Sequence, residues 1–144
     1  MVRIIVFLIT LSCLTAYSQT GTCPDSSTIT KFTKLMDIQF AKEYEGCTLK
    51  TEAIFLGTGN GGYKIPSRYK KLVIFRAYPE GQKPENNALT GQPVGNFCFI
   101  DKSKSDLIFN LKSGDKILLK GKVEITGSIG YRQTNFIVEQ LSKY

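Results

Sequence analysis

The stretch KILLKGKVEI, residues 116–125, decides the fold of this protein. Every second residue from Ile117 to Ile125 is apolar or glycine, and all but one of the residues between them are charged. Because successive side chains of a β-strand point to opposite faces of a sheet, this pattern gives one apolar face and one charged face. We therefore predict a strand over residues 115–126 that buries one face in a core and leaves the other in water.

Four more segments of the chain have strand character, at residues 47–57, 70–78, 96–101 and 132–141. In the first of them, Leu49, Ala53 and Phe55 lie on one side of the strand, and the charged Lys50 and Glu52 lie on the other. Glycines, prolines and the turn Ser113-Gly114-Asp115 separate the segments. Since no helical period between the strands is long enough for the crossovers of a parallel sheet, the five strands predict a small all-β, antiparallel barrel, closed or partly open.

A short helix is expected before the strands, at residues 27–44. Apolar residues recur there at steps of three and four, which places them on one face of a helix: Ile29, Phe32, Met36 and Phe40. We expect this face to pack against the barrel. The chain after its leader then consists of an N-terminal segment with the helix, residues 19–45, and a barrel, residues 46–144.

Residues 1–18 have the pattern of a signal peptide. Arg3 precedes an apolar run at residues 4–14, and Ala16-Tyr17-Ser18 places small residues at the two positions that a signal peptidase reads. The run is shorter than the roughly 20 residues of a membrane-spanning helix. We expect cleavage before Gln19 and export of the protein to the periplasm or the medium.

The four cysteines support this compartment without revealing their pairing. Cys13 lies in the leader, where its acylation is the less favoured alternative to cleavage. The remaining three, Cys23, Cys47 and Cys98, allow one disulfide and leave one thiol. Because Cys98 lies in the apolar run of residues 97–100, we expect it to be a small buried side chain rather than a reactive group.

Three stretches of the chain resemble a known family. They are AKEYEG at residues 41–46, NLKSGDKILLKGKV at 110–123 and FIVE at 136–139. With them, the chain from about residue 41 to 141 resembles the tRNA_anti-like family of exported bacterial OB-fold proteins. The resemblance implies a five-stranded OB-type barrel, and it does not by itself imply tRNA as a ligand. A netrin-like OB domain ranks second, because such domains begin with a cysteine and Cys23 does not directly follow the expected cleavage site.

The composition argues against familiar kinds of enzyme. The chain contains no histidine, so the commonest general base and the commonest metal ligand are missing. No motif marks a nucleophile with its base, a pair of catalytic carboxylates or a zinc site. Residues 57–62 match G-x-G-x-x-G, but Pro66 and the lack of a helical period after them do not supply the helix N-terminus that a dinucleotide requires. We expect a non-catalytic protein without a metal or cofactor.

Basic and aromatic residues gather between the first two strands. The chain has 19 Lys and Arg against 12 Asp and Glu, a net charge of +7, and residues 53–79 contain five basic residues, three tyrosines and no acidic residue. On an OB-type barrel, this segment and the loop between the fourth and fifth strands flank the face that binds oligonucleotides or oligosaccharides. The candidate ligand-binding residues are Tyr63, Arg68, Tyr69, Lys70, Lys71, Arg76, Tyr78, Tyr131 and Arg132.

These residues predict a non-catalytic binding module for an anionic oligomer, either a nucleic acid or an acidic oligosaccharide. Acidic glycans or lipid head groups suit an exported protein better than nucleic acid does. The alternative is a protein-interaction or envelope-structural module. Convergence of the candidate residues on one concave groove would favour ligand binding, and their scatter around the barrel would favour a protein partner. A second basic stripe, at Lys116, Lys120 and Lys122, is explained by strand alternation as a solvated face.

Overall fold

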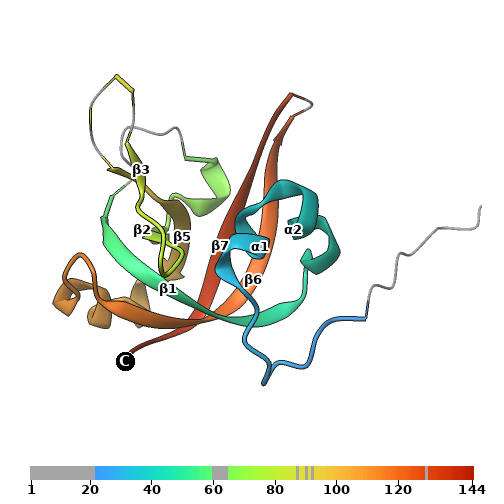
Figure 1. Ribbon diagram of the computed structural model, residues 1–144, viewed down its shortest axis with the longest axis horizontal. Coiled ribbons are helices and arrows are strands. Elements are labelled where there is room, and N and C mark those ends of the chain that lie inside the picture. Colours follow the sequence, from blue (N-terminus) through green and yellow to red (C-terminus); the bar gives the residue numbers. More distant parts are fainter. Residues whose placement is uncertain (1–21, 60–64, 87, 90, 92, 129) are drawn as a thin grey trace, which may run out of the picture.

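Five strands close into a barrel, with two short helices packed on one side of it (Figure 1). The computed structural model describes residues 22–59, 65–86, 88–89, 91, 93–128 and 130–144. In the order β1-β2-β5-β7-β6 around the barrel, the strands are β1 (Thr48–Thr58), β2 (Leu72–Tyr78), β5 (Asn96–Asp101), β7 (Tyr131–Lys143) and β6 (Lys116–Ser128). The predicted all-β, OB-type barrel is confirmed, and each strand end lies within two residues of its predicted position.

Neighbouring strands of the barrel pair antiparallel, with one exception. Strands β5 and β7 run parallel, because β7 returns beside β5 to close the barrel. Their ladder is short and joins residues 98–100 to residues 136–138. Beyond this ladder Asn96 and Thr134 line a recess, so the two strands part there.

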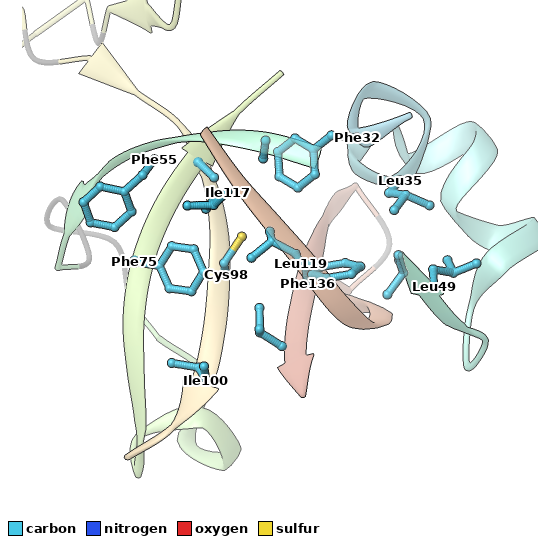
Figure 2. Packing of buried hydrophobic residues seen from close by; sticks show 14 of the residues in the cluster. Phe32, Leu35, Leu49, Phe55, Phe75, Cys98, Ile100, Ile117, Leu119 and Phe136 are labelled. Carbon is cyan, nitrogen blue, oxygen red and sulfur yellow. The ribbon is translucent and has the colours of Figure 1, made fainter. Parts of the chain in front are cut away.

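The interior is apolar because alternate residues of the strands point inward. On β6, Ile117, Leu119 and Val123 are buried, as the alternation predicts. Figure 2 shows Phe75 of β2 and Phe136 of β7 among the side chains that fill the space between the strands. Burial of this apolar surface is the main favourable contribution to folding.

Strand β6 contains a glycine that close approach to β7 requires. A Cβ at Gly121 would lie 2.0 Å from the carbonyl oxygen of Ile137, at a shift in the β6–β7 register. A second register shift, between Phe55 and Gly57, bends β1 so that its first half pairs with β6 and its second half with β2.

The predicted short helix before the barrel is confirmed, but it begins at Phe32 rather than near residue 27 and is divided into α1 (Phe32–Met36) and α2 (Ile38–Tyr44). Asp37 lies between them in an extended conformation, with ψ of 120°. Its carboxylate accepts a hydrogen bond from the Gln39 N–H at 2.9 Å and so caps α2.

The residues before α1 lie along a strand edge instead of forming a helix. Ile29 pairs parallel with Lys50, and the Thr30 N–H donates to the Lys50 carbonyl at 2.8 Å. The Thr51 hydroxyl donates to the Thr30 carbonyl at 2.7 Å. The first bond satisfies the Lys50 carbonyl of β1 and the second satisfies the Thr30 carbonyl, so extended backbone is favoured here over the helix that the apolar spacing predicts.

Both helices pack against the barrel, as expected. Phe32, Leu35 and Ala41 are buried in the same cluster as the barrel core. Figure 1 shows α1 and α2 beside β6 and β7. Within the described part of the chain, no helix is long and apolar enough to cross a membrane.

A disulfide between Cys23 and Cys47 joins the N-terminal segment to the start of β1. The sequence left this pairing open, and a disulfide is compatible with an exported protein. Cys98 is free and fully buried, as predicted, and burial raises the pKa of its thiol.

The connections between the strands contain short elements that the sequence did not reveal. A small hairpin, β3 (Glu85–Asn86) with β4 (Pro93–Val94), lies between β2 and β5. Short 3₁₀ helices occupy the other two long connections: η1 (Ser67–Tyr69) before β2, and η2 (Lys102–Lys104) and η3 (Asp106–Asn110) before β6.

Candidate functional site

The structure places the described binding candidates in different parts of the barrel. One group lies on or just after η1: Arg68, Tyr69, Lys70 and Lys71. Arg76 lies within β2, whereas Tyr78 and Arg132 line recesses at the barrel rim. Tyr63 lies outside the described residues, and so does the side chain of Tyr131.

Tyr69 is part of the packing and does not offer a ring face to a ligand. Its side chain is 4% exposed, its ring centroid lies 4.5 Å from that of Phe99, and its hydroxyl donates to Glu124 Oε2 at 2.5 Å. Burial first, and then the Glu124 carboxylate, raise the pKa of the Tyr69 phenol well above its usual value. Arg68 Nη2 lies 3.1 Å from the same carboxylate oxygen, so both residues attach η1 to β6.

The other described basic candidates of this region differ in their surroundings. Arg76 is half-buried and donates from Nη1 to the Pro93 carbonyl at 3.0 Å, which ties β2 to β4. Lys70 and Lys71 are exposed and make no ion pair within the described residues. The groove expected around the β1–β2 connection stays a prediction, because residues 60–64 lie outside the described part of the chain.

A groove lies between the N-terminal helices and the rim of the barrel. Three recesses of about 360, 460 and 340 Å³ follow one another along it. The first and second share Thr33, Pro79 and Gln82. The second and third share Met36, Gly95 and Asn96. We call these three adjoining recesses together the rim groove.

Hydrogen bonds hold the walls of the rim groove in place. The Thr134 hydroxyl donates to the Met36 carbonyl at 2.6 Å and so fixes the end of α1 against β7. The Gln133 amide donates to Asn135 Oδ1 at 2.9 Å. Gly95 fits the floor because a Cβ there would lie 2.9 Å from the Ala77 carbonyl oxygen.

The rim groove is lined by three basic and three acidic side chains. Glu52 and Glu80 line the first recess, but Lys116 lies 2.9 Å and 3.0 Å from their carboxylates. Hydrogen bonds from Tyr144 and then Lys116 hold the pKa of Glu52 below its usual value. The charged lining residues that make no ion pair within the described part of the chain are Lys31, Asp37, Lys83 and Arg132.

Uncharged polar side chains complete the lining. Tyr78, Gln82 and Asn96 all line the second recess, and Arg132 and Gln133 line the third. Sequence reasoning found Tyr78 and Arg132 but missed Lys83 and the amides. No local signal marks them, since the walls come from α1, the β2–β3 connection, β5 and β7.

A metal site is not apparent in the part of the chain that the structure describes, where no three Cys, Asp or Glu side chains cluster. Acidic residues there are engaged in caps and ion pairs. The Asp101 carboxylate accepts from the Ser103 N–H at 2.8 Å, and Asp115 lies 2.8 Å from Lys143.

Comparisons with known proteins find likeness only among solved structures. No family model matches the chain and no curated protein matches it, so membership of the tRNA_anti-like family stays a prediction. OBody NL8, solved bound to hen egg-white lysozyme, is 12% identical over 67% of this chain and 93% of its own, with a TM-score of 0.45. Schizosaccharomyces pombe Pot1pC, solved bound to single-stranded DNA, is 16% identical over 70% of this chain and 79% of its own, with a TM-score of 0.38. Likeness this remote says nothing about the ligand of the present chain.

Proposed function

We propose that this protein is an exported, non-catalytic binding module that holds an acidic oligosaccharide in the rim groove. The observation that carries the proposal is that two adjoining recesses are lined by aromatic, cationic and amide side chains: Tyr78, Lys83, Gln82 and Asn96 in the second, and Phe97, Arg132, Gln133 and Asn96 in the third. A sugar ring stacks on an aromatic face, its hydroxyls pair with amides, and its carboxylate pairs with a guanidinium or ammonium group.

The balance of groups in the groove favours a glycan over a nucleic acid. A nucleic acid carries one phosphate per nucleotide and calls for a row of cations along its backbone. The rim groove instead has amide and hydroxyl side chains among its lining residues, and three of its six charged side chains are acidic. That mixture matches a chain of hydroxyl-rich rings with an occasional carboxylate.

A protein partner is the second candidate, because apolar side chains stand exposed at the mouth of the same groove. Ile29 in the first recess is 49% exposed, and Val94 in the second is 43% exposed. Two exposed aliphatic side chains beside a polar cleft would contact the apolar side chains of a bound polypeptide.

Calorimetric titration of the oxidised protein with an oligogalacturonate tests the proposal, with a neutral glucan of equal length and a short single-stranded oligonucleotide as comparisons. Lys83→Gln with Arg132→Gln should weaken oligogalacturonate binding about tenfold or more, since each removes a charged hydrogen bond. Lys70→Gln with Lys71→Gln removes the same charge outside the groove and should leave the affinity nearly unchanged.

Three results would count against an acidic glycan in the rim groove. Absence of oligogalacturonate binding, or equal affinity for the neutral glucan, would reject the ligand class. Equal loss in the Lys70/Lys71 variant would reject the location and return the site to the β1–β2 connection. Binding of the oligonucleotide alone would replace the glycan by a nucleic acid.

A further inference from the structure

Strand pairing creates a concentration of positive charge on the outer side of β1 and β6. Lys50 of β1 stands directly opposite Lys120 of β6, and Lys122 lies two residues along the same face. From η2, the Lys104 ammonium donates to the carbonyl of Glu139 on β7 at 3.3 Å. We call Lys50, Lys104, Lys120 and Lys122 the cationic face.

Acidic side chains among the described residues balance the cationic face only in part. Among the described residues, Lys50 and Lys120 make no ion pair, and Lys122 lies 3.8 Å from the Glu139 carboxylate. Like charges directly opposite one another destabilise a sheet. Strand alternation requires only that the residues at these positions be polar. It does not explain why both members of the pair Lys50 and Lys120 are lysines.

The lysines spread in two dimensions over a sheet face and do not line a cleft. They extend across β1, β6 and the far side of β7, and neighbouring strands lie about 4.8 Å apart. A linear polymer would follow one row of such cations. A planar array of anions can contact all of them at once, and lysine ammonium groups on flexible stems suit single phosphates.

We propose that the cationic face docks this protein on a lipid bilayer that carries anionic phospholipid head groups. The half-buried Leu118 and Ile137 flank the lysines on the same outer side and add apolar contact at the head-group boundary. None of the residues of this face lines the rim groove, so the proposal stands apart from the proposed ligand.

Sedimentation of the oxidised protein with vesicles tests the docking. At low salt the protein should bind vesicles of phosphatidylcholine that contain about 30% phosphatidylglycerol, and it should dissociate from them as the salt concentration rises. It should not bind vesicles of pure phosphatidylcholine. Each lysine near a charged membrane contributes roughly fivefold, so Lys50→Gln, Lys120→Gln and Lys122→Gln together should lower partitioning about 100-fold. A triple control with the same charge change, Lys34→Gln, Lys42→Gln and Lys112→Gln, should lower it only a few-fold.

The cationic-face variant should melt no lower than the native protein, because it removes repulsion. Partitioning that is equal on neutral and anionic vesicles would overturn the proposal. An equal loss of vesicle binding in the control variant would also overturn it, because the binding would then depend on the net charge of the protein and not on this face. Binding to heparin without binding to anionic vesicles would overturn it in favour of a soluble polyanion.

Discussion

Opening the Cys23–Cys47 disulfide should cost the protein a large part of its stability. The bond closes a loop across a sequence separation of 24 residues, and that loop contains both N-terminal helices. In the chain-entropy model, a cross-link over a loop of this length restricts the unfolded chain enough to stabilise the native state by about 3.5 kcal/mol. That corresponds to roughly 300-fold in the folding equilibrium.

Urea denaturation of the oxidised protein and of Cys23→Ser measures this difference. Cys23 is the residue to replace because it is exposed, whereas Cys47 is 4% exposed and its substitution would also disturb the core. With the slopes usual for small domains, the midpoint should fall by roughly 1 to 3 M urea. Native protein treated with a mild reductant should give the same midpoint as the variant.

The reasoning fails if the oxidised protein and Cys23→Ser unfold at the same urea concentration. That result would mean that the segment from Cys23 to Cys47 is equally restricted in the unfolded chain without the bond. A variant that unfolds without cooperativity would instead show that the barrel depends on the attached helices to fold.

Three further perturbations follow from single contacts. Gly121→Ala should destabilise the protein by about 3 kcal/mol or more in urea denaturation, because its Cβ would meet the Ile137 carbonyl oxygen at 2.0 Å and neither backbone moves freely; a loss below about 1 kcal/mol would refute this. Tyr69→Phe should lose about 1 to 3 kcal/mol with the bond to Glu124. Because the folded-state pKa of Tyr69 is raised above its usual 10.0, the stability that Tyr69 contributes is complete below pH 10 and decreases as pH rises above that value. The melting temperature of the native protein should therefore fall more steeply above pH 10 than that of Tyr69→Phe. The pKa of Glu52 is lowered, so the stability that its carboxylate contributes is present above pH 4.5 and is lost as pH falls below that value. In Glu52→Gln the melting temperature should therefore fall less steeply on acidification, and an unchanged acid dependence would contradict this role of Glu52.

The sequence by itself determined the barrel strands and the character of the core. The alternation around Ile117, Leu119 and Val123 specifies a strand with one buried face, since the period of two is a local property of extended backbone. The apolar surroundings of Cys98 predicted its burial for the same reason. The residue types of the N-terminal segment predicted helix and packing, but the local pattern did not reveal the break at Asp37 or the strand-edge bonds of Ile29.

Only the tertiary structure decided which basic and aromatic residues remain available to a ligand. The residue types of Tyr69 and Arg68 are typical of a binding loop. In the structure, however, Glu124, far along the chain, holds both of them against the barrel. Tyr78 and the unpredicted Lys83 line one recess and Arg132 lines the adjoining one, because segments far apart in the chain come together at the rim. Such pairings depend on register and closure of the barrel, which arise from packing over the whole chain and have no signature in any short stretch of it.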